Sequence, residues 1–481
     1  MCDSSWNVNI HIVTWNVSTR YPEGVALHSL LGLNTNPEHD GDLPDFYVIG
    51  IHIVTWNVST RYPEGVALHS LLGLNTNPEH DGDLPDFYVI GLQEVNAQVQ
   101  NQVIGLFKED PWTNKFKEML KERNFVVVKT EQMQGLLLMI FTRKKHLLHL
   151  REIEAEYTRT GLGGIWGNKG AVSIRMNIYG CTAVFLNSHL AAHDHMLDER
   201  VEDYHKILQE HKYHIKSRET IFNHDYVFWF GDLNFRLTGE ATTSPEDIRA
   251  EVKKDNLGEL MQKDQLLLVM NQERAFSELT ERLPAFPPTF KFEPGTQEYD
   301  MKRRPAWCDR ILYRVSDRKY NNVKLIAKQN SYKSHPAFSI SDHKPVSSEF
   351  NIKIFSDPSE KMVEFAPIDT WTIGEEYTVK YTLPEGLDDA GSDWIGVYNA
   401  DFGSVEEYQA YEYTSRCKEE QRRTFSLTFP DTLHLPEDPA QTYVLLYFQS
   451  TGTRGITGLA GMSEPFHVEH RARSPSVSSV D

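Results

Sequence analysis

The chain has 481 residues, 40% of them hydrophobic, and this length exceeds what one hydrophobic core usually holds, so the sequence predicts two domains. Its formal net charge of -19 disfavours non-specific nucleic-acid binding, and without a run of about 18 apolar residues we expect no membrane-spanning helix. The start lacks a secretory signal and the four cysteines lack metal-type pairing, which favours the reducing cytoplasm over a disulfide framework.

The first feature along the chain is a perfect duplication, in which residues 10–50 and residues 51–91 have the same sequence. Two undiverged copies followed by unrelated sequence do not fit a solenoid, whose repeats diverge and number three or more. An exon duplication or a gene-model error is the simplest interpretation.

Only the second copy continues from YVIG into LQEV, which places Asn57 and Glu94 in one continuous unit. The first copy has Ile53 where that glutamate belongs. We therefore expect residues 51–91 to dock, with residues 1–50 as a leader and redundant appendage, because chain termini tolerate additions best.

The alternative is a hybrid, in which strand 11–18 docks and supplies Asn16 while residues 19–85 loop out. Loop closure would tolerate this, because its entropic cost grows slowly with length. The hybrid would, however, leave an apolar strand pair without a place in the sheet, so we favour Asn57.

Residues 51–355 alternate short apolar runs, such as DFYVIGLQEV and YVFWFGDL, with loops and stretches of helical spacing. This pattern predicts an α/β layered sandwich with its site at the ends of the strands. Residues 365–470 alternate apolar and polar positions between turn-rich loops, which predicts an all-β sandwich. The composition of residues 471–481 predicts a disordered tail.

Acidic, amide, basic and histidine side chains recur where the apolar runs end. The clusters GLQEV, NSHL, GDLNFR, PAWCDRIL and SDHKP hold Glu94, Asn187, His189, Asp232, Asn234, Arg236, Asp309, Arg310, Asp342, His343 and Lys344. Any one such cluster is commonly a turn or a hydrogen-bonded core position. Five clusters with the same placement predict one shared site.

Hydrolysis at phosphorus is the chemistry that fits these side chains. Mg²⁺ takes carboxylate and amide oxygens, which Glu94 and Asn57 can supply, and Asp342 is a further candidate ligand. Asp232 can orient or deprotonate the attacking water, and Asn234 can position it.

Two histidines complete the predicted machinery. His189 and His343 can donate hydrogen bonds to the phosphate oxygens as negative charge builds on them. A histidine in that role needs a carboxylate to fix its tautomer and keep it cationic, and Asp309 is the candidate.

Basic residues near these clusters predict a phosphate-binding surface in an otherwise acidic chain. The glycine-rich run TGLGGIWGNKGAV carries one lysine, and residues 291–310 concentrate several lysines and arginines beside Asp309. The expected substrate-binding residues are Lys169, Asn187, Arg236, Lys291, Lys302, Arg303, Arg310 and Lys344.

These blocks, in this order, resemble the inositol polyphosphate 5-phosphatases, a Mg²⁺-dependent branch of the DNase I-like fold. WFGDLNFR and RPAWCDRIL resemble the two signature blocks, and TWNV, GLQEV, GNKGAV, NSHLAAH and SDHKPV agree with further blocks across residues 51–355. Residues 365–470, with SDWIGVY, are similar to the SKICH domain that follows some of these enzymes. The resemblance implies a four-layer α/β sandwich followed by a smaller immunoglobulin-like sandwich.

The resemblance also implies the substrate. It is the 5-phosphate of phosphatidylinositol 4,5-bisphosphate and 3,4,5-trisphosphate, with soluble inositol polyphosphates as further substrates, and its removal dampens phosphoinositide signalling. In the family, a tyrosine-lysine pair and a Lys-x-Arg recognise the neighbouring 4-phosphate. Lys291 and Arg303 match, whereas Phe290 stands at the tyrosine and Met301 at the first lysine, with Lys302 one step along.

Three other functions compete with this one. A nuclease of the same fold would need a wide basic face for duplex phosphates, which the acidic chain does not predict. The C-x5-R pattern of a cysteine phosphatase occurs twice in the chain, at Cys308 and Cys417, but acidic and bulky residues fill both loops. A catalytically impaired phosphoinositide-binding scaffold, acting through the C-terminal domain, stays open because the duplication could have disabled the catalytic domain.

The acidic chain carries no lipidation motif, so it must reach an anionic membrane in another way. We expect a cytoplasmic protein that associates peripherally with the cytosolic face of the plasma membrane or endoplasmic reticulum. The expected means is a protein partner of the C-terminal domain.

Overall fold

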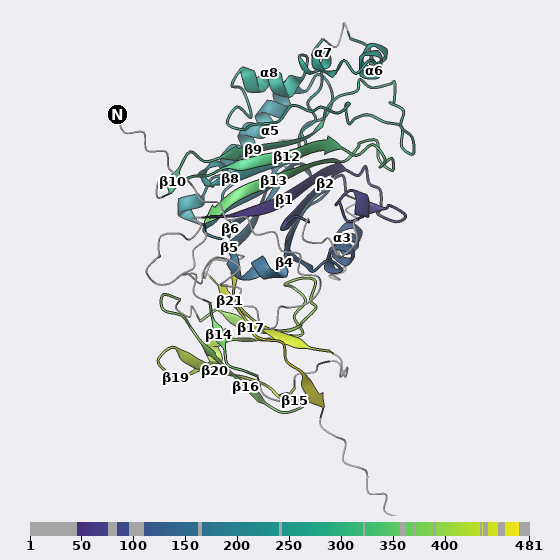
Figure 1. Ribbon diagram of the computed structural model, residues 1–481. Coiled ribbons are helices and arrows are strands. Elements are labelled where there is room, and N and C mark those ends of the chain that lie inside the picture. Colours follow the sequence, from purple (N-terminus) through teal and green to yellow (C-terminus); the bar gives the residue numbers. More distant parts are fainter. Residues whose placement is uncertain are drawn as a thin grey trace, which may run out of the picture.

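A computed structural model describes residues 46–75, 84–95, 110–161, 166–239, 243–320, 323–355, 362–368, 371–387, 391–432, 435, 441–450 and 457–470 (Figure 1). The expectations for most of the first copy, including Asn16, and for the tail at 471–481 concern residues outside these ranges. No helix among the described residues is long and apolar enough to cross a membrane.

The first sheet has six strands in the order β12-β13-β1-β2-β4-β3. Their bounds are β1 Phe46–Asn57, β2 Phe87–Gln93, β3 Phe125–Met133, β4 Leu136–Arg143, β12 Ala327–Ser334 and β13 Val346–Phe355. All seven residues of β2 are buried, because a central strand of a layered sandwich has both faces covered.

The second sheet contains β5 to β9 side by side and in sequence order. Their bounds are β5 Leu150–Thr160, β6 Trp166–Ile178, β7 Cys181–His189, β8 Tyr226–Asp232 and β9 Asp309–Val315. Strands β7 and β8 are parallel, with His189 opposite Asp232 at their carboxyl ends. The sheet therefore brings two of the predicted clusters to one edge.

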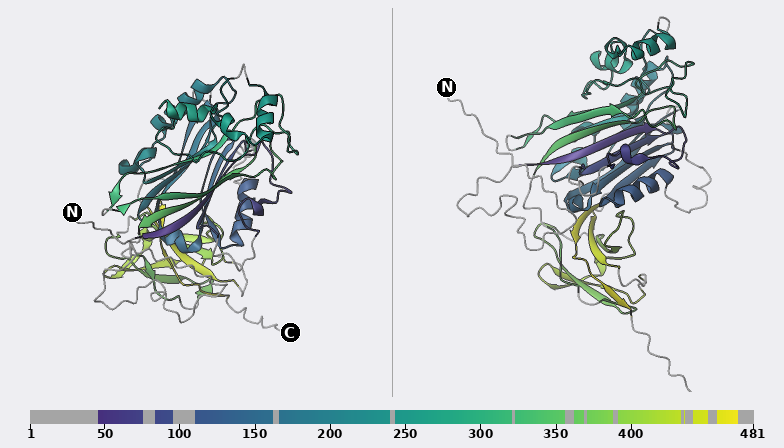
Figure 2. Two further views of the ribbon diagram at one scale, coloured as in Figure 1. Left: turned by 45° about the horizontal axis from the view of Figure 1, so that its top comes forward. Right: turned by 45° about the vertical axis from the view of Figure 1, so that its right-hand side comes forward.

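The two sheets pack face to face, and helices cover their outer faces (Figures 1 and 2). Helix α3, Pro111–Lys121, packs Trp112 and Phe116 against the first sheet. Helices α5, Leu197–Glu210, and α8, Gln265–Asn271, cover the outer face of the second sheet. Between them in the chain come α6, Pro245–Lys253, and α7, Leu257–Met261. The four-layer α/β sandwich is confirmed.

The seam between the two copies lies inside strand β1. Its first residues, from Phe46 to Gly50, come from the end of the first copy and pair with β13. From Ile51 onward the strand also pairs with β2, as far as Asn57 opposite Gln93. The expected border at residue 51 therefore falls within a strand, and the second copy occupies the central position of the sheet.

The C-terminal region is an all-β sandwich with its own core around Trp371, Tyr381, Val397 and Leu445. Four strands continue the second sheet: β17 Trp394–Asn399, β18 Ala410–Tyr413, β21 Tyr443–Ser450 and β22 Thr457–Met462. The opposite layer holds β14 Glu364–Phe365, β16 Tyr377–Thr382, β19 Lys418–Gln421 and β20 Thr424–Phe429, and β15 Trp371–Ile373 pairs with β23 Val468–His470.

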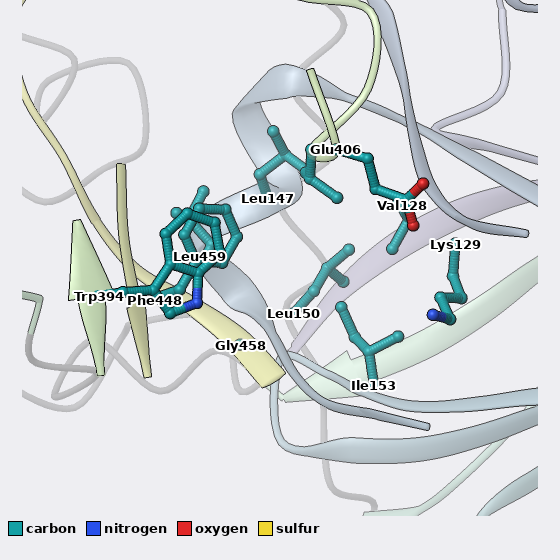
Figure 3. A pocket seen from close by; sticks show the side chains of 11 residues that line it. Val128, Lys129, Leu147, Leu150, Ile153, Trp394, Glu406, Phe448, Gly458 and Leu459 are labelled. Carbon is teal, nitrogen blue, oxygen red and sulfur yellow. The ribbon is translucent and has the colours of Figure 1, made fainter. Parts of the chain in front are cut away.

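The two domains contact each other along β3 and β5. The backbone N–H of Val127 donates to the carbonyl of Gly403 at 2.8 Å, and Lys117 of α3 pairs with Glu407 at 3.1 Å. A cavity of about 130 Å³ lies between the domains. Figure 3 shows Trp394 and Phe448 on one side of it and Leu150 with other aliphatic side chains on the other. The C-terminal domain is therefore packed against the N-terminal α/β domain.

Candidate active site

The parallel strands β7 and β8 set the centre of the site. Nε2 of His189 lies 3.3 Å from Oδ2 of Asp232, and both side chains are buried. Gly231, just before the aspartate, has a φ of 139°, and a Cβ there would lie 2.0 Å from the carbonyl oxygen of Ser188. Only glycine lets the two strand ends approach this closely.

The end of β1 brings Asn57 to the same point. Its Nδ2 donates to Oε1 of Glu94 and to Oδ2 of Asp232, at 3.0 Å each, so two carboxylates converge on one amide. Glu94 follows β2 with a φ of 54°, a left-handed conformation that is uncommon for this residue type and recurs at functional sites.

This donor set fits a hard divalent cation. Carboxylate and amide oxygens are what Mg²⁺ and Ca²⁺ prefer, and a half turn of the Asn57 amide would present Oδ1 in place of Nδ2. The side chain of Glu94 is 42% exposed, which leaves room for water and substrate oxygens in the shell of the ion. The residues that would hold the cation are thus Asn57, Glu94 and Asp232.

A second group of possible ligand atoms, from Asp232, Asp309 and His343, lies within 4.8 Å in the described part of the chain. Nδ1 of His343 is 2.9 Å from Oδ2 of Asp309, and its Nε2 is 3.8 Å from Oδ2 of Asp232. Thr289 donates its hydroxyl to the same Asp309 oxygen at 2.7 Å. The histidine is therefore held between two carboxylates, which is an ion-pair arrangement.

The charges of this group follow from burial and from each other. Burial alone would lower the pKa of His343, but the Asp309 and Asp232 carboxylates outweigh it and raise the pKa to about 9. Burial alone would raise the pKa of Asp232, but His343 and its other cationic neighbours hold it well below the usual range. At neutral pH His343 is therefore a cation, whose two ring nitrogens donate hydrogen bonds and cannot ligate a metal.

His189 has the opposite electrostatic character. Burial, and then the Lys169 ammonium group that donates to its Nε2, lower the pKa of His189. Burial also lowers the pKa of Lys169, to about 8. One histidine of the site is thus neutral and the other cationic.

The turn after β8 carries two more predicted residues. The backbone N–H of Asn234 donates to Oδ1 of Asp232 at 3.1 Å, and its side-chain amide donates to the carbonyl of Leu190 at 3.1 Å. Arg236 donates to Oδ1 of Asn234 and lies 4.2 Å over the ring of Phe290. Asn234 therefore shapes the turn that aims Asp232.

Among the basic residues at 291–303, Lys291 lies at the rim of the site, with its Nζ 5.9 Å from the ring of Phe290, which contacts His343. Lys291 pairs with Asp342, an expected metal ligand, at 3.3 Å. The Asn57 amide contacts Asp232 instead of Asp342. Lys302 and Arg303 are exposed, and Arg303 is one of the cations that lower the pKa of His193, after the effect of burial.

Three expected substrate-binding residues are not brought to the site, which corrects the expectation. Asn187 is fully buried, where its amide donates to the carbonyls of Leu92 and Leu137. Lys344 is buried and donates to two backbone carbonyls. Arg310 is fully buried and bonded to Asp264 and Glu281. Polar groups whose partners are all internal hold strands together instead of binding substrate.

Other residues in contact with the site went unnoticed in the sequence. They include Thr289 and Trp56, whose Nε1 donates to the His343 carbonyl at 3.1 Å. Phe290, which the sequence places in the predicted substrate site, packs its ring 4.6 Å from that of His343. Ser341 donates to the Asn57 carbonyl at 2.6 Å. Thr289 and Trp56 could have been suspected from the sequence, because each lies within two residues of a predicted site residue, Lys291 and Asn57 respectively.

Comparisons with known proteins agree with this arrangement. Residues 54–349 match the endonuclease/exonuclease/phosphatase family 2, and residues 363–468 match the SKICH domain. Phosphatidylinositol 4,5-bisphosphate 5-phosphatase A of Mus musculus is 34% identical over 97% of this chain and 42% of its own length. The chain thus spans less than half of that relative. Inositol polyphosphate 5-phosphatase K of Mus musculus is 32% identical over 97% of this chain and 90% of its own length.

A solved structure agrees as well. It is the inositol polyphosphate 5-phosphatase domain of SPsynaptojanin, in complex with inositol (1,4)-bisphosphate and a calcium ion. That domain is 31% identical with a TM-score of 0.53, and the match covers 64% of this chain and 85% of that chain. The chain belongs to the endonuclease/exonuclease/phosphatase family, among the inositol polyphosphate 5-phosphatases that carry a SKICH domain.

Proposed function

We propose that this chain is a Mg²⁺-dependent phosphatase that removes the 5-phosphate from phosphatidylinositol 4,5-bisphosphate and 3,4,5-trisphosphate and from soluble inositol polyphosphates. The observation that carries the proposal is one buried carboxylate, Asp232, in contact with the Asn57 amide and close to two histidines, one neutral and one cationic. A non-catalytic scaffold would not need this arrangement of buried charges, which costs stability unless each charge is compensated.

The residues have distinct roles in the proposed reaction. Asp232 stays ionised at neutral pH, so its carboxylate accepts a hydrogen bond from the attacking water and orients it. His343 donates to a phosphate oxygen as charge builds there, and Asp309 keeps it cationic and fixes its tautomer. When bound, the divalent cation supplies further neutralisation of the phosphate charge.

The rim residues give the proposed substrate class. Lys291 and Arg303 provide the charge for a second phosphate next to the one that is cleaved. Phe290, whose ring lies between Arg236 and His343, cannot supply the hydroxyl that relatives use there. We therefore propose that recognition of the 4-phosphate depends on charge more than on a neutral hydrogen bond.

The SKICH domain is the proposed targeting element. Its acidic composition does not suit direct attraction to an anionic lipid surface. We propose peripheral recruitment to the cytosolic face of the plasma membrane or endoplasmic reticulum through a protein partner, which would hold the catalytic domain near its lipid substrate.

Phosphate release from short-chain phosphatidylinositol 4,5-bisphosphate, with and without a chelator, tests the function. Asp232→Asn should lower kcat/KM by about a thousandfold or more, because the water loses its charged acceptor. Asp198→Asn is the matched control, since Asp198 is also an ion-paired aspartate, 2.5 Å from Arg274, but is 79% exposed on α5.

The choice of lipids sharpens the test. Phosphatidylinositol 4-phosphate, which has no 5-phosphate, should release nothing, and Mg²⁺ should restore the activity that chelation removes. Equal release from both lipids, full activity in Asp232→Asn, or indifference to chelation would each contradict the proposal.

A further inference from the structure

Strand β18 is the last strand of the nine-stranded sheet and carries exposed tyrosines. Tyr408 is 46% exposed, Tyr411 43% and Tyr413 46%, so three of the eight exposed large hydrophobic side chains among the described residues gather on this short segment. Single exposed aromatic residues are common on protein surfaces, whereas a contiguous group marks an interaction site.

The tyrosines form one connected aromatic surface. The ring of Tyr411 lies 5.2 Å from that of Tyr408, 5.5 Å from that of Tyr413 and 5.9 Å from that of Trp394. Trp394 in turn stacks on Phe448 at 4.1 Å, and both line the cavity between the domains (Figure 3). The exposed surface is therefore anchored on rings that are fixed by packing.

Gly396 leaves the space in which the rings of Trp394 and Tyr398 lie. It is the register partner of Tyr411 on β17, and a Cβ there would lie 2.8 Å from the Trp394 ring and 2.6 Å from the Tyr398 ring. A larger residue would push these rings apart. The backbone thus holds these rings in close contact at the edge of the sheet, where Tyr411 meets its aromatic neighbours edge-on.

Within the part of the chain that the structure describes, β18 pairs with β17 alone. Thr414 donates its N–H inward to the carbonyl of Asp393 at 2.9 Å. Because the N–H and C=O groups of a strand alternate in direction, those of Tyr411 and Tyr413 point away from β17. These groups are the template that an added strand requires.

Charge indicates the kind of partner. Residues 363–468 carry 18 aspartates and glutamates but 6 lysines and arginines, so this domain supplies -12 of the formal net charge of -19. Glu406 is exposed near β18, whereas Glu412, on the strand itself, is already paired with Arg416 at 2.7 Å. This balance repels an anionic lipid surface and a second copy of the chain, and it attracts a basic segment.

We propose that the free edge of β18 binds an extended, basic segment of a partner protein as an added strand. The backbone of that segment pairs with Tyr411 and Tyr413, and its apolar side chains pack on the tyrosine rings. Strand addition gives affinity through the main chain and specificity through alternate side chains. The site lies outside the catalytic machinery, so it does not depend on the proposed phosphatase activity.

The test measures binding of a fluorescein-labelled peptide of alternating lysine and valine to the full chain by fluorescence anisotropy. Tyr411→Lys should weaken binding by about tenfold or more, because it removes a ring and places a positive charge on the edge. The matched control is Tyr157→Lys, since Tyr157 is 44% exposed on β5 of the catalytic domain. Phosphate release by Tyr411→Lys should equal that of the unaltered chain.

Four further measurements separate strand addition from its rivals. The same peptide with N-methyl groups on alternate residues should bind at least about tenfold more weakly, because one edge of its backbone can no longer donate. A peptide of alternating glutamate and valine should not bind. Equal binding of the N-methylated or acidic peptide, or no effect of Tyr411→Lys, would overturn the proposal. So would Tyr411-dependent binding to vesicles rich in phosphatidylserine, or a dimer that Tyr411→Lys dissolves.

Discussion

Two clusters of buried charge begin at consecutive residues of the same strand. On one side of β9, Asp309 faces His343 at 2.9 Å in a group that reaches the partly exposed Glu94 through Asp232 and Asn57. On the other side, Arg310 is bonded to Asp264 at 2.9 Å and to Glu281 at 2.6 Å, and Tyr332 donates to Glu281 at 2.8 Å. The first cluster is open and the second is closed.

The difference shows that a charged motif can divide between catalysis and stability. In the closed cluster every charge has an internal partner, and Arg310 and Asp264 are wholly inaccessible. In the open cluster, Glu94 is 42% exposed and the two histidines differ in charge state. Alternation of side chains along a strand is enough to separate the two roles.

The largest effect that would test this division is on folding. Arg310→Met should lower the free energy of unfolding by about 3–5 kcal/mol, because Asp264 and Glu281 would be left buried without their cation. Urea unfolding measures the loss. KM of the folded fraction for phosphatidylinositol 4,5-bisphosphate should not change, and a raised KM with unaltered stability would show that Arg310 binds substrate after all.

The next effect is on the open cluster, through its histidine. Because Asp309 holds the pKa of His343 near 9, above its ordinary value of 6.5, the cation and its contribution to stability are complete below about pH 6.5 and disappear as the pH rises through 9. Activity should fall over the same alkaline range.

Asp309→Asn should lower kcat by about a hundredfold and move the alkaline limb of the pH–rate profile to lower pH. Profiles of kcat/KM for both proteins give the result. An unchanged limb in Asp309→Asn would mean that His343 is not the group that titrates.

The smallest effect concerns the rim. Lys291→Ala should raise KM for the 4,5-bisphosphate lipid by about tenfold with little change in kcat, because it removes one charge-assisted bond to a phosphate that does not react. Lys254→Ala is the control, since Lys254 is 67% exposed and paired with Glu251 on α6. Equal KM values for the two variants would remove Lys291 from the substrate site.

Much of the open cluster could be predicted from the sequence because its residues follow strands. The carboxyl ends of parallel β7 and β8 meet at one edge, so His189 and Asp232 become neighbours. Arg310 could not be placed in this way. Which side of β9 it faces depends on the phase of a strand that begins one residue earlier, and its partners Asp264 and Glu281 are far away in the sequence.

The packing of the two domains against each other could not be predicted from the sequence either. The contact of Val127 with Gly403 is a backbone pairing that leaves no periodic trace in either segment. The extension of β1 into the first copy could not be predicted for a different reason. Phe46–Gly50 has the same letters as Phe87–Gly91, so propensity alone cannot say which neighbour each one pairs with.

The duplication itself offers the most direct test of the account, because Asn16 and Asn57 share the same local sequence. Asn57 contacts Glu94 and Asp232, whereas Asn16 lies outside the described residues. Mg²⁺-dependent phosphate release should fall by about a hundredfold or more in Asn57→Ala and stay unchanged in Asn16→Ala. Loss in Asn16→Ala with full activity in Asn57→Ala would show that the first copy builds the site.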